Sequence, residues 1–115
     1  MTKKLISKLK GIPASYGIVK GKVKVVCNPR DINKLKSSEI LVTKFTNPLF
    51  TPAILKASAI ITDTGGKLCH AAIVAREFGI ACVVGTEKAT RVLRDGMNVI
   101  VDGEKGIIYY KNGQH

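Results

Sequence analysis

The sequence predicts an α/β fold in which short strands alternate with short helices. Apolar residues make up 45% of its 115 residues, which suits the core of one compact domain. Glycines and prolines separate the apolar runs and mark the ends of the expected elements. Residues 58–85 are typical of a strand, a glycine-containing loop, a helix and a second strand.

The first predicted strand covers residues 18–27, where the V-K-V alternation indicates a half-exposed strand. Gly17 and Gly21 are expected at a turn or a bulge of this strand, because glycine often marks such irregularities. Residues 39–44 form the second predicted strand.

A short helix is predicted after Pro52, because proline is favoured in the first turn of a helix. Thr46 or Thr51 is the expected N-cap, since a threonine hydroxyl can accept a hydrogen bond from a free amide of the first turn. Residues 58–63 are then predicted to form a buried strand.

The second half of the sequence continues this alternation. A helix over 70–78 is expected to stop at Gly79, because glycine is favoured at the residue that follows a helix. The elements predicted after it are a strand at 81–85, a helical turn at 88–96 and a hairpin over 97–110.

The formal net charge is +11, and the basic residues gather in the first third of the chain. Residues 1–36 contain ten Lys and Arg against one acidic residue, Asp31. Such a region fits a nucleic acid, an acidic partner protein or a phosphorylated substrate, or it is a solvated surface that keeps the protein soluble. Nucleic acid is not the expected partner, because Tyr16 is the only aromatic residue among these lysines. We divide the chain into a basic N-terminal segment (1–10), a domain (11–110) and a tail (111–115).

The three cysteines form no CxxC pair, and their odd number predicts reduced thiols in the cytoplasm. Cys27 and Cys82 lie in predicted strands and are expected in the core, whereas Cys69 is expected near the surface at a helix start. No apolar run approaches the roughly 18–20 residues of a membrane span, and the first residues lack the apolar stretch of a secretory signal. We therefore expect a soluble protein without a membrane partner.

The candidate site is the loop that joins the strand 58–63 to the helix 70–78. In a β-loop-α-β unit, ligands bind at this loop and at the first helical turn. Gly65 and Gly66 allow positive φ angles and the close approach of another molecule. The first amides of the helix have no partner within the helix and carry partial positive charge, a combination that binds phosphate.

His70 lies in this first turn and is one of two histidines in the sequence. A helix N-terminus disfavours a charged imidazolium, so we expect a neutral ring with a lone pair free to attack phosphorus. A phosphoryl group on the ring would lie near the amides of Ala71, Ala72 and Ile73, and the small alanine side chains leave room for a donor or an acceptor. The alternative is that His70 only caps the helix or fills space.

Other residues near the loop admit two readings. Thr62 and Thr64 either bind the phosphoryl oxygens or cap the turn. Arg76 lies about 240° round the helix from His70, so it is expected to bind the sheet edge or a partner rather than the phosphoryl group. A metal site built on His70 and the nearby cysteines is not predicted, because it lacks a fourth ligand and a known spacing.

Four segments form one longer pattern across residues 11–109: GIPASYGIVKGKV, ILVTKFTNPLFTP, TDTGGKLCHAAIVAREFGIACVVGT and LRDGMNVIVDGEKGIIY. In this order they resemble the mobile phosphohistidine domain of PEP-utilising enzymes, such as phosphoenolpyruvate synthase, pyruvate phosphate dikinase and enzyme I of the sugar phosphotransferase system. The resemblance implies a swivelling β/β/α domain with His70 as the phosphorylated histidine. The sequence departs from that pattern at Leu68, where dikinases often have threonine, at Ala81 in place of the usual proline, and at Leu49, where many relatives have an acidic residue.

The resemblance also implies a phosphoryl carrier that takes the group from PEP or from an ATP-derived species and passes it to an acceptor. The donor and acceptor sites would belong to an ATP-grasp or PEP/pyruvate-binding partner, with Mg²⁺ in the partner's site and no cofactor on this chain. Such a carrier does not turn over without its partner, since neither of those domains fits into 115 residues. Two alternatives stay open: a non-catalytic docking or regulatory module with the same fold, and a nucleic-acid-binding domain that uses the basic first third.

Overall fold

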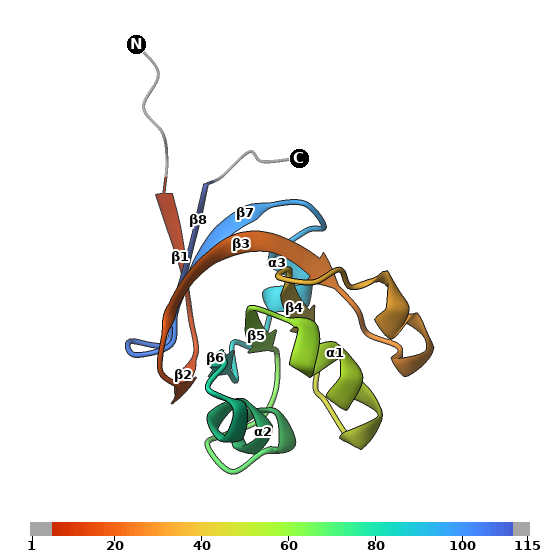
Figure 1. Ribbon diagram of the computed structural model, residues 1–115. Coiled ribbons are helices and arrows are strands. Elements are labelled where there is room, and N and C mark those ends of the chain that lie inside the picture. Colours follow the sequence, from red (N-terminus) through yellow and green to blue (C-terminus); the bar gives the residue numbers. More distant parts are fainter. Residues whose placement is uncertain (1–5, 112–115) are drawn as a thin grey trace.

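Short strands pair into one strongly curved sheet, over which the helices are distributed (Figure 1). The computed structural model describes residues 6–111. Its strands are β1 (Ile6–Lys10), β2 (Ile12–Ser15), β3 (Ile18–Val25), β4 (Ile40–Thr43), β5 (Ala59–Thr62), β6 (Ala81–Val84), β7 (Asn98–Asp102) and β8 (Ile107–Lys111). Its α-helices are α1 (Thr51–Lys56), α2 (His70–Phe78) and α3 (Ala89–Val92), and two 3₁₀ turns are η1 (Pro29–Lys34) and η2 (Pro48–Phe50).

The order of the strands across the sheet is β1-β8-β7-β3-β4-β5-β6-β2. The pairs from β3 through β4 and β5 to β6 are parallel, and the others are antiparallel. We call β4, β5 and β6 with α1 and α2 the parallel half, and β1, β8, β7 and β3 the antiparallel half. Only Gly11 separates β1 from β2, although these strands lie at opposite ends of the order, so the sheet curls until its two edges meet.

The curled sheet encloses an inner core. Residues of every strand except β2 point into it, and α3 packs against β4 and β5 and closes one side. Its buried members are Leu9, Val23, Ile40, Val42, Ala59, Ile61, Ala81, Val83, Ala89, Leu93, Met97, Val99, Val101 and Ile108. Because strands from both halves contribute, this core joins the two halves into one body.

A second, outer core lies between the parallel strands and the helices α1 and α2. Leu41, Ile60 and Cys82 alternate along their strands with the inner-core residues and point to this side. The helices supply Phe50, Ala53, Ile54, Ala71, Ala72 and Ala75. The strands of the parallel half are therefore buried on both faces, which explains why they are short continuous apolar runs in the sequence.

Most of the predicted elements are confirmed. The helix α2 has the predicted bounds, and Gly79 follows it in the left-handed conformation at φ 68°. The strands predicted at 39–44, 58–63 and 81–85 are β4, β5 and β6, shorter by one residue at one or both ends. The predicted hairpin is β7 and β8, the helical turn is α3, and the strand expected at 18–27 is β3, which ends at Val25.

The strands β1 and β2 were not predicted from the sequence. β1 falls in the segment that the sequence marks as basic, and it pairs with β8 in the antiparallel half. β2 contains Pro13 and is itself an edge strand: among the described strands it pairs only with β6, with a register shift between Pro13 and Ser15. Proline is tolerated at such an edge because its missing amide is not needed there.

The glycine and capping predictions are partly wrong. Gly17 lies at the turn before β3 with φ 135°, as expected, but Gly21 pairs regularly with Val99 inside the strand. Neither threonine is the N-cap of α1: that position is Phe50, which makes no side-chain capping bond. Asn47 caps the preceding turn η2, where its side chain accepts the amide of Leu49 at 2.9 Å.

The described chain starts and ends on neighbouring strands. Ile6 at the start of β1 pairs with Lys111 at the end of β8. The start of β1 and the end of β8 lie at the end of the molecule away from α2 (Figure 1). Within residues 6–111, no helix combines the length and the apolar character needed to cross a membrane.

Candidate functional site

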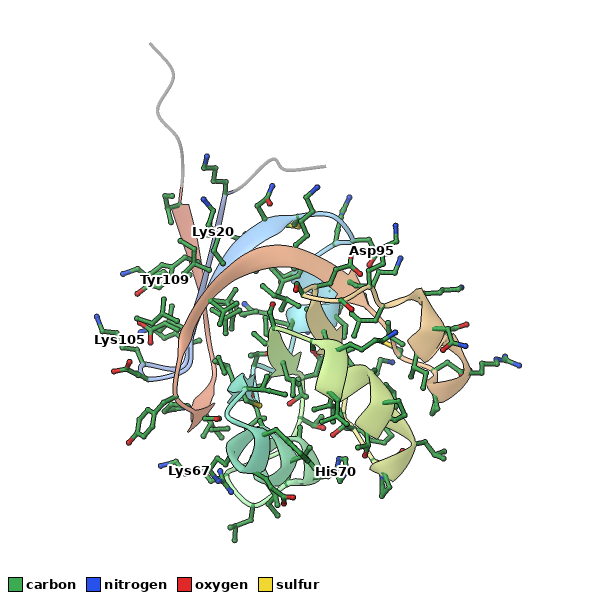
Figure 2. The ribbon with its side chains drawn as sticks, viewed as in Figure 1. Lys20, Lys67, His70, Asp95, Lys105 and Tyr109 are labelled. Atoms are coloured by element: carbon green, nitrogen blue, oxygen red, sulfur yellow. The ribbon has the colours of Figure 1, made fainter. Side chains whose placement is uncertain are left out.

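The candidate site forms where two loops of the parallel half meet. One loop follows β4 and the other follows β5, so both leave the carboxyl ends of adjacent parallel strands, the usual place of a ligand site in such sheets. The second loop leads into α2, whose first residue is His70. Figure 2 shows His70 on the side of α2 that faces α1.

The ring of His70 is held by Thr46 from the other loop. Nδ1 of His70 lies 2.8 Å from Oγ1 of Thr46, which is buried. When Nδ1 carries the proton and donates to this hydroxyl, the lone pair of Nε2 is free. Thr46 is therefore part of the candidate site, although sequence reasoning considered it only as a helix cap.

The two threonines of the β5 loop hold the backbone in this structure. Oγ1 of Thr62 donates to the carbonyl of Thr64 at 2.6 Å, and Oγ1 of Thr64 donates to the carbonyl of Lys44 at 3.0 Å. The sequence predicts that these threonines either bind the phosphoryl oxygens or cap the turn. The two bonds correspond to the second role. The amide of Thr64 also donates to Lys44, so the two loops are tied together.

The two glycines of the loop differ. Gly65 has φ 110°, and a Cβ there would lie 2.8 Å from Sγ of Cys69, so both the backbone angle and the space require glycine. Gly66 has no positive φ and no heavy atom within 4 Å of a Cβ position. The prediction of a positive φ is therefore confirmed for Gly65 and wrong for Gly66.

The start of α2 offers free amide groups. The amides of Ala71 and Ala72 have no acceptor within residues 6–111, whereas the amide of Ile73 donates to the carbonyl of Cys69 at 3.0 Å. No side chain caps this end of the helix. The amides of Ala71 and Ala72 are therefore open, as the sequence predicts. The amide of Ile73 is not, because it already donates within the first turn.

His70 borders a small hollow of about 70 Å³. The hollow is lined by Phe45, Thr46, Thr62, Thr64, Gly65, Cys69, His70 and Ala71. None of these lining residues is a carboxylate, so no negative side chain in the hollow opposes an incoming phosphoryl group. Phe45 lines the hollow with 57% of its surface exposed, and Leu68, in the same loop as Gly65, is 84% exposed.

Arg76 fixes the β5 loop from the far side of α2. Its guanidinium donates to the carbonyl of Ala14 at 2.9 Å and to the carbonyl of Lys67 at 2.6 Å. The predicted contact with the sheet edge is thereby confirmed, since Ala14 belongs to the edge strand β2. A larger hollow of about 580 Å³ lies beside Arg76 and Tyr16, but His70 does not line it.

The three cysteines lie in different environments. Cys82 is buried in β6, as predicted, and burial raises the pKa of its thiol to about 12, with Cys69 adding to the shift. Cys69 is half-buried at the N-cap of α2. Cys27 is exposed, so the prediction that it belongs to the core is wrong, because β3 ends at Val25 and leaves Cys27 in the connection to η1.

Comparison with known sequences identifies close relatives. A model of the PEP-utilising enzyme mobile domain matches residues 35–106. The chain is 57% identical to a probable phosphoenolpyruvate synthase of Archaeoglobus fulgidus and 54% identical to the phosphoenolpyruvate synthase of Pyrococcus furiosus, each over 101 residues and 88% of this chain. It spans 13% and 12% of the length of these two curated relatives.

Solved structures share the fold. A solution structure of Enzyme I matches with a TM-score of 0.60 and 30% identity, over 74% of this chain and 35% of that chain. Aconitase X of Thermococcus kodakaraensis in its holo-form matches with a TM-score of 0.64 and 20% identity, over 90% of this chain and 98% of that chain. At the lower identity the second likeness concerns the fold alone.

Proposed function

This chain belongs to the family of PEP-utilising enzyme mobile domains, and we propose that it is a phosphoryl carrier in which Nε2 of His70 receives and releases the group. The observation that carries the proposal is the bond between Nδ1 of His70 and Thr46, because it holds the ring with Nε2 free at a helix N-terminus. The open amides of Ala71 and Ala72 support the same role, since they favour the dianion that arrives.

The proposed transfer is a pair of in-line displacements. The lone pair of Nε2 forms the N–P bond while the bond from phosphorus to the donor oxygen breaks, and the donor leaves with that electron pair. The proton stays on Nδ1, where Oγ1 of Thr46 accepts its hydrogen bond. An acceptor oxygen then attacks phosphorus, and the electrons of the N–P bond return to Nε2. Positioning and charge neutralisation supply most of the catalysis in such a step.

The donor and acceptor sites are assigned to other proteins or domains. The relatives named phosphoenolpyruvate synthase contain about eight times the length that this chain matches, which leaves ample room for such sites. We infer a PEP- or ATP-linked donor on an ATP-grasp or PEP/pyruvate-binding partner. Mg²⁺ is assigned to that partner, because the hollow at His70 offers threonine, cysteine and histidine rather than the carboxylates that Mg²⁺ prefers.

The test uses the phosphoenolpyruvate synthase of Pyrococcus furiosus, with the span that this chain matches removed, as the source of donor sites. With labelled PEP or ATP, the wild-type chain is expected to acquire one phosphoryl group that is labile in acid and stable in alkali. His70→Ala is expected to abolish the label. Label that survives acid, or no transfer to the wild-type chain, would contradict the carrier role.

His115→Ala is the matched control, because it removes the other histidine of the sequence. It is expected to take up label at the wild-type rate. Thermal melts of both variants establish that loss of label in His70→Ala does not come from unfolding. Label that persists in His70→Ala and disappears in His115→Ala would move the carrier site to the tail.

A further inference from the structure

The outward face of the antiparallel half carries many lysines and almost no negative charge. Its strands β1, β3, β7 and β8 contain six lysines and one carboxylate. The carboxylate, Asp102, is buried, and its Oδ1 accepts the amides of Glu104 and Lys105, both at 3.0 Å. Asp102 therefore stabilises the β7–β8 turn and does not neutralise the lysines.

The register of the strands brings four of the outward side chains into one row. Lys8 lies opposite Tyr109, Tyr109 opposite Ile100, and Ile100 opposite Lys20. Nζ of Lys8 is 5.8 Å from the centre of the Tyr109 ring, within the range of a cation–π interaction. An aromatic ring and an aliphatic side chain thus lie between two lysines. Figure 2 shows Lys20 and Tyr109 on the side of the molecule away from His70.

Neighbouring rows repeat this combination of apolar and basic side chains. Lys10 and Lys22 are exposed, and so are Ile6 and Ile18, at 57% and 63%. A hollow of about 400 Å³ on this side is lined in part by Ile6, Lys20, Ile100 and Tyr109. We call Lys8, Lys10, Lys20, Lys22, Ile100 and Tyr109 the basic sheet face.

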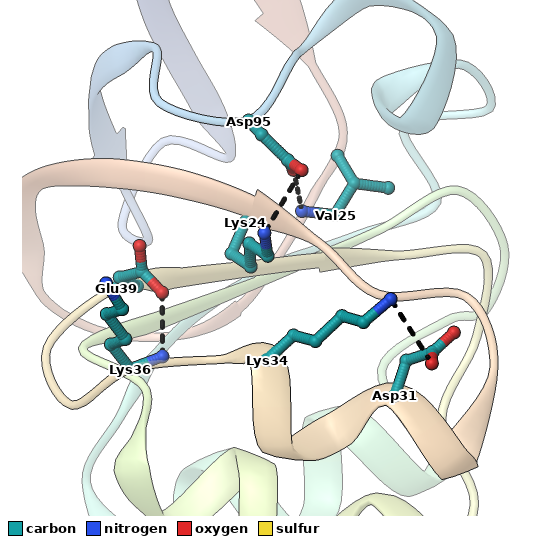
Figure 3. A network of polar contacts seen from close by, with 7 residues as sticks. All are labelled: Lys24, Val25, Asp31, Lys34, Lys36, Glu39 and Asp95. Atoms are coloured by element: carbon teal, nitrogen blue, oxygen red, sulfur yellow. Dashed lines mark hydrogen bonds and ion pairs between the residues drawn. The ribbon is translucent and has the colours of Figure 1, made fainter.

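Among the described residues, the four lysines of this face have no carboxylate partner, unlike Lys24 and Lys34. Lys24, near the end of β3, is paired with Asp95 at 3.3 Å, and Lys34 is paired with Asp31 at 3.5 Å (Figure 3). Within residues 6–111, the four lysines of the basic sheet face have no carboxylate at ion-pair distance. Their charges add to a positive field on one side of the molecule.

We propose that the basic sheet face docks an acidic protein surface, in which Asp and Glu side chains surround an apolar centre. The four lysines supply charge complementarity, and Tyr109 and Ile100 supply the apolar contact. A nucleic acid fits less well, because single-stranded sites use several stacking aromatics and this face has one, and because lysine lacks the planar fork of arginine. The inference goes beyond phosphoryl transfer, and a partner docked here leaves His70 uncovered.

The test compares binding of two peptides of equal charge at about 0.15 M salt, where weak surface attraction is screened. One is polyglutamate, and the other has leucines interleaved with the glutamates. The second is expected to bind more tightly and to shift the amide NMR signals of β1, β3, β7 and β8. His70→Ala is expected to bind it as the wild type does, so loss of the carrier role and loss of docking are separate outcomes.

The variant is Lys8→Glu/Lys20→Glu, and its matched control of equal net charge is Lys36→Glu/Lys88→Glu, at two exposed lysines outside this face. The first pair is expected to weaken binding by at least about tenfold, and the control by far less. If both pairs weakened binding equally, the effect would depend only on net charge, and the proposal would be overturned. Tighter binding of an oligothymidylate of the same charge, equal binding of the two peptides, or no binding at this salt concentration would overturn it as well.

Discussion

The two halves of the sheet differ in which strand faces are buried and in the charge that they expose. In the parallel half, both faces of the strands are buried, and the proposed transfer site is built from loops at the carboxyl ends of β4 and β5. In the antiparallel half, one face is buried and the other is open and basic. The first half holds one imidazole ring through a short-range hydrogen bond, and the second presents a field of positive charge from lysines that lack a carboxylate partner within residues 6–111. With the roles proposed above, this separation would let reaction and docking change independently.

The largest effect among these tests should come from Thr46→Val. It removes the partner of Nδ1 of His70 at nearly constant volume, so the ring is no longer held for attack by Nε2. Transfer is expected to fall by roughly 10–100-fold, because small misplacements at a reacting centre are costly. The rate of label uptake, measured with the same donor as for His70→Ala, checks this.

Two controls decide whether Thr46 acts through the hydroxyl and whether the halves are separate. Thr46→Ser keeps the hydroxyl and should restore most of the rate, which a purely structural role of the methyl group would not allow. Lys8→Glu/Lys20→Glu should leave the rate unchanged. If the lysine pair slowed transfer as much as Thr46→Val, the comparison between the halves would fail.

The next effect concerns the loop itself, through the pair Gly65→Ala and Gly66→Ala. At Gly65 a methyl group meets Cys69 at a positive φ, so the free energy of unfolding should fall by about 1–3 kcal/mol. At Gly66 nothing obstructs a methyl group, and the change should stay within about 0.5 kcal/mol. Denaturant unfolding measures both. Equal losses at the two positions would mean that the loop is restrained in some way other than by the conformation of Gly65.

The smallest effect is a pH dependence that comes from the buried strand β6. Burial raises the pKa of Cys82 to about 12 from 9.0, so above about pH 9 the unfolded chain releases a proton that the folded protein keeps. Stability therefore decreases as pH rises through this window, and Cys82 contributes about 1 kcal/mol of that loss by about pH 10.

Denaturant unfolding of wild type and Cys82→Ala at about pH 8 and about pH 10 isolates this contribution, since other titrating groups are common to both proteins. The variant should lose less stability between the two pH values. Iodoacetamide applied to the native protein should label the exposed Cys27 before Cys82. Early labelling of Cys82 would show that β6 opens more readily than its burial indicates.

Sequence reasoning did best where the signal is local. The helix 70–78 has its own stop at Gly79, and the hairpin of β7 and β8 pairs neighbours in the chain, so both could be read from a short window. β1 could not be predicted in this way. Its one buried residue, Leu9, lies between two lysines and produces no clear alternation, and its partner β8 lies about a hundred positions later in the chain. β2 contains a proline, which argues against a strand in any window.

The candidate site shows the same limit. His70, Gly65 and the helix amides follow from one contiguous segment, and their placement there was expected. Thr46 contacts His70 across 24 positions, and no local periodicity reports a bond between two loops. Topology could have suggested it: once β4 and β5 are known to be parallel neighbours, the residues just after each strand must lie close together.

The pairing of Ile6 with Lys111 has a mechanical consequence where this fold is flanked by further polypeptide on both sides. The chain then enters and leaves the domain through adjacent positions, at the end remote from His70 (Figure 2). Two neighbouring attachments act as a hinge, and the body of the domain becomes a lever arm. A modest turn at the hinge carries the imidazole through a wide arc, while the curled sheet between them keeps the arm stiff.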